Sequence, residues 1–195
     1  MNEEIQKAYE IIKEGGIILY PTDTIWGIGC DATNAEAVAK IYKLKQRTET
    51  QSMIVLMNGE KMMYNVFKDI PEVAWQIIDL SDSNDGELAK QNPTTLILDN
   101  PRNVAPNIIS ADNSLGVRIV KEPFCFKLME KLKKPLVSTS ANISGKPTPI
   151  AFKDISPEII KGVDYVVNLY REKIGGKPST IIKLTNDSQV KVIRK

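Results

Sequence analysis

The segment at residues 16–31, GIILYPTDTIWGIGCD, constrains the fold more than any other part of the chain. It opens with the apolar run 17–20, which is typical of a buried strand. Pro21 ends that run, because proline supplies no N–H to a sheet ladder. The small polar residues Thr22–Thr24 follow, and then Trp26 and two glycines. Since open α/β sheets bind ligands outside the carboxyl ends of their strands, the segment predicts a binding site. A polar turn beside a core tryptophan explains it equally well.

The length and composition indicate one globular domain. The chain has 195 residues, of which 42% are hydrophobic and 26% charged, so we expect a single domain over residues 1–195. Its net charge of +2 does not indicate a strong nucleic-acid binder. No apolar run approaches the roughly 18 residues of a membrane span, and the acidic start shows no signal peptide. Cys30 and Cys125 suggest neither a disulfide framework nor a zinc site, so we expect a cytoplasmic protein.

The sequence contains no histidine. A Ser-His-Asp triad, a Cys-His pair and a His-ligated metal are therefore excluded as catalytic devices. An enzyme built from this sequence must work with carboxylates, lysine, arginine, hydroxyls and backbone amides. Such a set favours reactions in which the placement of anionic groups does most of the catalysis.

Hydrophobic spacing predicts the secondary structure. Asn34 is positioned to cap the second helix, and a terminal hairpin is expected to turn at residues 186–187. Helices are predicted at 3–14, from the Asn34 cap to a basic far end at 43–47, and at 71–80, 123–133 and 157–161. Strands are predicted at 17–20, 53–57, 94–98, 115–120, 135–137, 163–168, 179–184 and 189–193, with loops at 81–92, 101–113 and 138–147.

Four cations gather at the end of the second helix: Lys40, Lys43, Lys45 and Arg47. Cations at a helix C-terminus are favourable for the helix dipole, which gives the cluster a purely structural explanation. The functional alternative is a phosphate clamp made by Lys45 and Arg47, which lie two residues apart where the helix unwinds.

Two further features point to anion binding. Arg118 lies inside an apolar strand, where an arginine either reaches a sheet edge or points at an anion. The stretch 138–147, STSANISGKP, follows another apolar strand and can present several N–H and O–H donors to phosphate or carboxylate oxygens. A polar connection that turns at Gly145 is the plainer explanation.

Generic nucleotide motifs fit the sequence poorly. The GGKPS stretch at 175–179 lacks the upstream glycine of a P-loop. Residues 27–32 match G-x-G-x-x-A, but in a dinucleotide-binding unit the first glycine directly follows the strand. Here residues 21–26 intervene, so this interpretation is disfavoured.

Three stretches together resemble the YrdC-like family, whose best-known members are threonylcarbamoyl-AMP synthases. These are YPTDTIWGIGCDA at 20–32, the Lys45-x-Arg47 pair and STSANISGKP at 138–147. The resemblance covers nearly the whole chain. It implies an α/β fold with an open, twisted, mixed β-sheet and flanking helices around a large, concave, electropositive site. It also implies the reaction of L-threonine, bicarbonate or CO2 and ATP to threonylcarbamoyl-AMP and pyrophosphate, for N6-threonylcarbamoyladenosine modification of tRNA.

The resemblance also implies roles for individual residues. Lys45 and Arg47 are expected to be the catalytic pair on the triphosphate, with Mg²⁺ accompanying ATP and no protein metal ligands assigned. The ATP-binding residues would be Lys45, Arg47, Gln51, Thr95, Ser138, Asn142 and Arg194. The threonine-binding residues would be Thr22, Thr24, Arg118, Ser140 and Ser179.

The sequence departs from the family pattern in three places. The family's Arg-Pro-x-x-Lys/Asn-Pro-Leu is RTETQSM at 47–53, and its Pro-Gly-Pro-Leu-Thr is reduced to NPTT at 92–95. Val120 stands where the family's Val-Arg-x-Pro strand has proline. These changes bear on loop geometry and nucleotide contacts.

Two alternative functions remain open. One is a non-catalytic protein of the same fold that binds tRNA or double-stranded RNA, and the other is a paralogue that adenylates another carbamate. Partners of the enzyme would be tRNA and the transferase complex that receives the adenylate.

Overall fold

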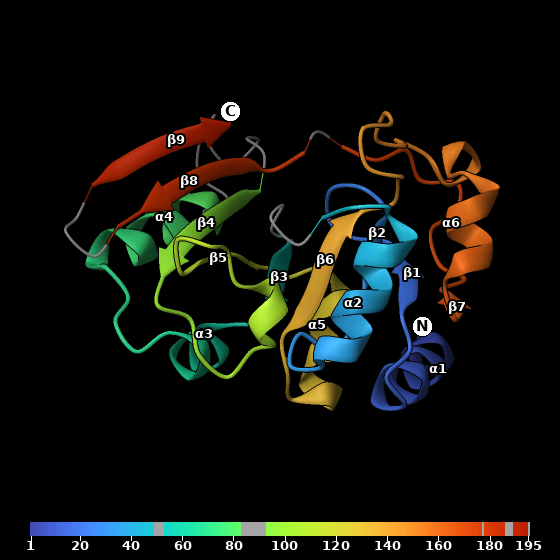
Figure 1. The fold of residues 1–195 in the computed structure, drawn as a ribbon, viewed down its shortest axis with the longest axis horizontal. Coiled ribbons are helices and arrows are strands. Elements are labelled where there is room, and N and C mark those ends of the chain that lie inside the picture. The colour runs from blue at the N-terminus through green and yellow to red at the C-terminus, as the bar shows by residue number, and fades with distance from the viewer. Residues whose placement is uncertain (49–52, 83–92, 177, 186–188, 195) are drawn as a thin grey trace.

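The computed structural model describes residues 1–48, 53–82, 93–176, 178–185 and 189–194. Helices and strands alternate along most of the chain, as Figure 1 shows. In chain order the elements are α1 (Asn2–Lys13), β1 (Ile18–Tyr20), β2 (Gly27–Gly29), α2 (Ala35–Leu44), β3 (Ile54–Met57), α3 (Glu60–Val66), α4 (Glu72–Asp82), β4 (Thr94–Asp99), η1 (Pro106–Ile108), β5 (Ser114–Ile119), α5 (Pro123–Leu132), β6 (Leu136–Ser140), η2 (Phe152–Asp154), α6 (Pro157–Gly162), β7 (Tyr165–Val166), β8 (Thr180–Leu184) and β9 (Val190–Arg194).

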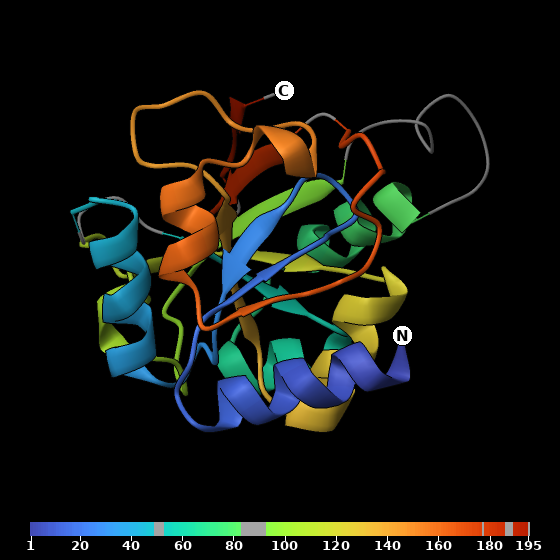
Figure 2. The same ribbon diagram turned by 90° about the vertical axis from the view of Figure 1, so that its right-hand side faces the viewer.

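The described strands form one open mixed sheet in the order β7-β1-β2-β6-β3-β5-β4-β8-β9. The pairs β1/β7, β3/β5 and β4/β8 are parallel, and the other neighbours are antiparallel. The N-terminus lies low and the C-terminus high in both views (Figures 1 and 2). The predicted fold class, an open mixed α/β sheet with flanking helices, is confirmed.

Helices cover both faces of this sheet. Figure 2 separates α2 on the left from α5 on the right, with strands between them. The side chain of Asn34 caps α2 as predicted, by accepting hydrogen bonds from the N–H groups of Glu36 and Ala37. Helix α2 then buries Val38 and Ile41 in the core, while α1 packs on α5 across the sheet's other side. The core is therefore continuous along the sheet.

The structure differs from the predicted elements in several places. Residues 27–29 form strand β2, which was not among the predicted strands. A Cβ added at Gly29 would lie 2.2 Å from the Val137 carbonyl oxygen, so the close approach of β6 requires glycine there. Strand β6 continues to Ser140, because it pairs with β2 and β3, so the predicted loop begins later. Helix α3 was not predicted, and β7 is shorter than its predicted strand. The predicted loop at 81–92 and turn at 186–187 lie mostly or wholly outside the described residues.

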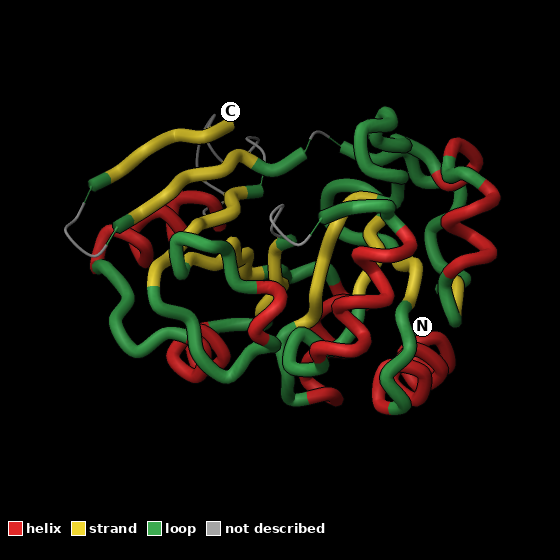
Figure 3. The backbone as a smooth tube through the Cα atoms, in the orientation of Figure 1, coloured by secondary structure: helices red, strands yellow, loops and turns green. Residues whose placement is uncertain are grey.

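Loops dominate the chain between β6 and β8 (Figure 3). Backbone hydrogen bonds fix part of this stretch beside the polar turn after β1: Gly176 N donates to Thr24 O at 2.7 Å, and Gly175 N donates to Ile150 O at 2.6 Å. These loops therefore pack against the segment at residues 16–31 that opened the sequence analysis. In the described part of the chain, no helix combines the length and the apolar character that a membrane crossing needs.

Candidate functional site

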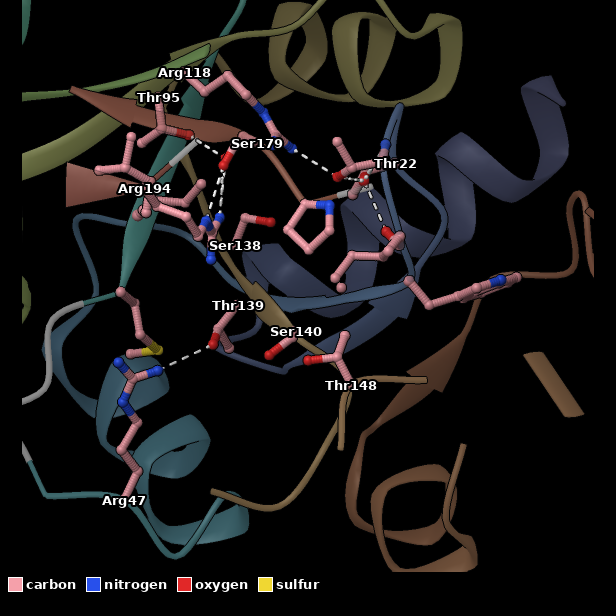
Figure 4. A pocket seen from close by; sticks show the side chains of 18 residues that line it. Thr22, Arg47, Thr95, Arg118, Ser138, Thr139, Ser140, Thr148, Ser179 and Arg194 are labelled. Carbon is pink, nitrogen blue, oxygen red and sulfur yellow. Dashed lines mark hydrogen bonds between the residues drawn. The ribbon is translucent and has the colours of Figure 1, made fainter. Parts of the chain in front are cut away.

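One cavity of about 240 Å³ lies where the turn after β1, the end of β6 and the start of β8 meet (Figure 4). Its lining draws on residues far apart in the sequence, from the turn at Thr22 to Arg194 in the last strand. Most of the predicted site residues line it: Thr22, Thr24, Arg47, Thr95, Arg118, Ser138, Ser140, Ser179 and Arg194. Two predicted residues, Lys45 and Asn142, lie outside the lining, and Gln51 lies outside the described residues.

Arg118 enters the cavity from β5, the upper side in Figure 4. Its side chain is only 4% exposed, so the arginine does not reach a sheet edge. One guanidinium nitrogen, Nη2, donates to the Asp23 carboxylate at 3.0 Å and to the Thr24 hydroxyl at 3.4 Å. Among the described residues, its Nε has no hydrogen-bond partner. A buried guanidinium with a spare donor is suited to bind an anion.

The turn after β1 carries two linked hydroxyls. The Thr22 hydroxyl donates to the Ile25 carbonyl oxygen at 2.7 Å, and it lies 3.0 Å from the Thr24 hydroxyl. Both threonines are buried although they lie in a turn. The chain therefore fixes these hydroxyls before any ligand arrives.

Trp26 belongs both to the candidate binding site and to the core, the two roles that the sequence left open for its segment. It lines the cavity and is also a core residue, 3% exposed, whose ring packs on Phe152 with centroids 4.9 Å apart. The tryptophan therefore joins the cavity wall to the loops between β6 and β8.

A second group of hydroxyls lies between β4 and β8. The hydroxyls of Thr95 and Ser179 are 2.8 Å apart, and Arg194 donates through Nε and Nη2 to the Ser179 carbonyl oxygen at 3.0 and 2.8 Å. Burial lowers the pKa of Arg194, and the charge of Arg118 lowers it further. Two guanidiniums that repel each other across one cavity are stabilised by an anion between them.

Arg47 reaches the cavity from the opposite side, the lower left in Figure 4, where Nη1 donates to the Thr139 hydroxyl at 3.3 Å. Helix α2 ends in a Schellman motif just before it: Arg47 N donates to Tyr42 O and Gln46 N to Lys43 O. Gln46 occupies the left-handed position of that motif, with φ 51°. This turn separates Lys45 and Arg47, whose side chains point to different places. Burial lowers the pKa of Arg47.

The sequence places Lys45 with the other cations at the end of α2, but in the structure its side chain is buried. It is 2% exposed, and its ammonium donates to the carbonyl oxygens of Ser140 at 2.5 Å and Asn142 at 2.6 Å. Burial lowers its pKa from 10.5 to about 7, with a smaller contribution from the charge of Arg47. Helical spacing carried the signal, because residue 45 follows the buried Ile41 by four positions.

Asn142 is held in the same way. Its side-chain amide donates to the Lys146 carbonyl oxygen at 2.6 Å, and its oxygen accepts from the Ser140 hydroxyl at 2.5 Å. Asn142 lines a separate cavity of about 560 Å³ and is not part of the main cavity's lining. Ser140 thus faces the main cavity, whereas Asn142 supports it from behind.

Sequence reasoning missed two cavity hydroxyls. Thr139 lies between two predicted residues of β6 and contacts Arg47, a contact that depends on how far α2 extends. Thr148 lies beside Ser140 in Figure 4, at the end of a loop with no periodic signal. Only tertiary structure brings Thr148 to the cavity.

The cavity is built for anionic ligands that also offer groups to hydroxyls. Three guanidiniums line it, and among the described residues no carboxylate does. Guanidinium groups bind phosphate and carboxylate oxygens through paired N–H donors. The hydroxyls add neutral donors and acceptors at fixed positions. The arrangement suits catalysis by placement and charge stabilisation, with no covalent nucleophile.

The sequence is similar to one protein family over most of its length. Residues 10–195 match the family Sua5_yciO_yrdC, which carries the description "Telomere recombination". A protein of Methanocaldococcus jannaschii, provisionally named threonylcarbamoyl-AMP synthase, is 34% identical to this chain. The matched region covers 97% of this chain and 86% of the M. jannaschii protein. The threonylcarbamoyl-AMP synthase of Pseudoalteromonas translucida is 28% identical and covers 91% of each chain.

The fold is similar to a solved structure with a bound amino acid. The crystal structure of P. abyssi Sua5 complexed with L-threonine superposes with a TM-score of 0.77 at 26% identity. The superposition covers 94% of this chain but only 52% of that one, so this chain spans about half the length of the Sua5 protein.

Proposed function

The chain belongs to the Sua5_yciO_yrdC family, and from that premise we propose that it is a threonylcarbamoyl-AMP synthase. This nucleotidyltransferase would convert L-threonine, bicarbonate or CO2 and ATP into threonylcarbamoyl-AMP and pyrophosphate, for N6-threonylcarbamoyladenosine in tRNA. The observation that carries the proposal is the convergence of Arg47, Arg118 and Arg194 with a ring of hydroxyls on one cavity.

The chemistry needs no histidine and no covalent intermediate. The threonine amine attacks the carbon of bicarbonate or CO2 and gives a carbamate, with loss of water or a proton. A carbamate oxygen then attacks the α-phosphorus of ATP, and the bond to the β-phosphate oxygen breaks to release pyrophosphate. Charge builds on the phosphate oxygens during this step, so fixed cations stabilise the transition state.

The proposed roles divide the cavity lining between the two larger substrates. Arg47 would stabilise the triphosphate, and Arg118 would hold the threonine carboxylate through its spare Nε donor. Thr22, Thr24, Ser140 and Ser179 would hold threonine's amine and hydroxyl. The nucleotide would contact Thr95, Ser138, Arg194 and, beyond the described residues, Gln51, whereas Asn142 would act through Ser140.

Mg²⁺ fits the described cavity poorly. The lining offers hydroxyls but no carboxylate, and the described chain contains no cluster of metal-ligating side chains. Because Mg²⁺ in nucleotide enzymes is commonly held by carboxylates as well as phosphates, we route no step through it. Any Mg²⁺ would belong to the ATP substrate.

An omission assay tests the function. Purified protein is incubated with ATP, bicarbonate and L-threonine, and pyrophosphate is measured with each substrate left out in turn. We expect pyrophosphate only when all three are present. Turnover with a different acceptor in place of threonine would favour the paralogue that adenylates another carbamate. Absence of pyrophosphate under every condition would favour the RNA-binding protein, although the net charge of +2 speaks against strong RNA binding.

The proposal extends to the setting of the reaction. The product would pass to a transferase that modifies tRNA, and tRNA itself is a proposed partner. A cytoplasmic location is in keeping with two free cysteines, both buried.

A further inference from the structure

Lys45 makes contacts unlike those expected of a phosphate ligand. Its ammonium donates to the carbonyl oxygens of Ser140 and Asn142, and it lies 3.5 Å from the Asn142 side-chain oxygen. It does not line the cavity. In its protonated form the Lys45 amino group has three N–H donors, and these three acceptors match them in number.

The main chain at Lys45 holds the same loop. The Lys45 carbonyl oxygen accepts from Ser144 N at 2.9 Å. The end of α2 and the loop after β6 are thus joined at both the side chain and the backbone of one residue. Losing the ammonium would take one donor from each carbonyl oxygen, although that of Ser140 also accepts from Asn142 N at 2.9 Å. Removing a donor from a part-buried acceptor costs free energy.

This contact reaches the cavity through Asn142 and Ser140. The Ser140 hydroxyl donates its proton to the Asn142 side-chain oxygen at 2.5 Å, the same atom that Lys45 approaches. Ser140 therefore turns lone pairs, not its proton, toward the cavity. A hydroxyl in that state accepts a hydrogen bond from an amine.

We propose that Lys45 is a positioning residue, which fixes the Ser140 hydroxyl as an acceptor for the amine of the amino-acid substrate and does not touch the triphosphate. The inference rests on the proposed function. It divides the Lys-x-Arg pair: Arg47 faces the ligands, and Lys45 shapes the wall behind Ser140.

Threonine binding without nucleotide tests the inference directly. Calorimetric titration with L-threonine alone compares the wild type with Lys45→Met, Lys45→Arg and the control Lys43→Met, which removes an exposed cation from the same helix end. We expect Lys45→Met and Lys45→Arg to weaken threonine binding by about tenfold or more, as for a lost hydrogen bond to a charged ligand. Lys43→Met should bind as the wild type does.

The arginine variant separates the two roles. Arginine replaces lysine well at a phosphate, but its larger planar group does not fit a buried cage of carbonyl oxygens. Kinetics of Lys45→Arg should therefore show impaired use of threonine. Wild-type threonine affinity in Lys45→Met, or wild-type activity in Lys45→Arg, would overturn the inference.

Two further measurements distinguish a failure of the inference from a failure of the proposed function or a loss of folding. If the wild type binds no threonine, the proposed function fails, and hydrogen exchange decides on Lys45. Faster exchange at residues 140–146 in Lys45→Met than in Lys43→Met supports the positioning role, and equal exchange overturns it. If both Lys45 variants unfold, acetic anhydride labelling of the wild type decides. Lys45 should resist labelling with or without ATP, whereas labelling that ATP suppresses would contradict the inference.

Discussion

Two sides of the cavity use similar residues in different ways. We call Lys45, Ser140 and Asn142 the Lys45 wall, and Arg118, Arg194, Thr95 and Ser179 the Arg118 wall. On the Lys45 wall, the ammonium and the amide spend their hydrogen bonds on other protein atoms. On the Arg118 wall, two guanidiniums repel each other, and the buried Nε of Arg118 has no hydrogen-bond partner among the described residues.

The difference shows that buried polar groups at one site can have two roles, a structural one and a ligand-binding one. A buried cation whose donors are all used by the protein fixes the shape of the site. A buried cation with a spare donor is poised for a ligand, because leaving that donor unpaired costs free energy until an acceptor arrives. The residue type alone does not distinguish the two.

The largest effect should come from the Arg118 wall. Arg118→Met removes a buried guanidinium, and each lost hydrogen bond to a charged ligand costs about 1.5–3 kcal/mol. We expect threonine-dependent pyrophosphate release to fall by roughly a hundredfold or more. The control is Arg102→Met, since Arg102 is exposed, its side chain donates to the Tyr64 and Asn65 carbonyl oxygens of α3, and it lies outside the cavity lining. Normal turnover in Arg118→Met would remove the ligand role of this wall.

Substrate choice sharpens the comparison, because hydroxyls occur on both walls. Serine keeps threonine's hydroxyl and loses one methyl, which should cost about 1–3 kcal/mol. Valine keeps the shape but leaves the site's hydroxyls unpaired. Initial rates of pyrophosphate release at equal, subsaturating concentration should fall in the order threonine, serine, valine. A faster rate with valine than with serine would mean that the hydroxyls do not read the side chain.

Much of the Arg118 wall could be predicted from the sequence. Apolar runs mark where strands lie, and polar residues at their ends or an arginine within them stand out against that pattern. Arg118 was found in this way, as was Thr22, which lies outside this wall in the turn after β1. The family resemblance added Ser179 and Arg194, whose approach to each other depends on how β8 and β9 pair.

The Lys45 wall was harder to predict. The sequence places Lys45 among the cations at the end of the helix, and charged side chains rarely enter a core. Its spacing from Ile41 nevertheless puts it on the buried face of α2. The carbonyl oxygens that accept its hydrogen bonds lie 95 and 97 residues further along the chain. No local pattern announces them, so only the fold shows that this charge is structural.

The pH dependence of stability offers a test specific to the Lys45 wall. The pKa of Lys45 is about 7 in the fold and near 10.5 in the unfolded chain. Between these pH values the unfolded chain holds a proton that the folded chain has released, so the free energy of unfolding rises with pH. In urea unfolding, the free energy of unfolding of the wild type should rise relative to that of Lys45→Met by up to about 1.4 kcal/mol per pH unit from pH 7 to 10. Parallel curves would contradict the lowered pKa.

The smallest effect concerns the turn that separates the two cations. Gln46 has φ 51°, a conformation that costs a residue with a Cβ roughly 1–2 kcal/mol and glycine almost nothing. Gln46→Gly should therefore raise the free energy of unfolding by about 1 kcal/mol. The midpoint of urea unfolding measures it, with Lys43→Gly as a control expected to destabilise the helix. A lower midpoint in Gln46→Gly would show that the glutamine side chain stabilises the turn.

The central claim, that this cavity joins threonine, one carbon and AMP, is tested most directly by tracing that carbon. The protein is incubated with ATP, L-threonine and ¹³C-bicarbonate, and the adenylate is analysed at once by mass spectrometry. We predict an adenylate that contains threonine and one ¹³C atom, and its loss in Arg118→Met. Pyrophosphate release with an adenylate that carries no ¹³C would contradict the account, because the chain would then activate threonine without forming a carbamate.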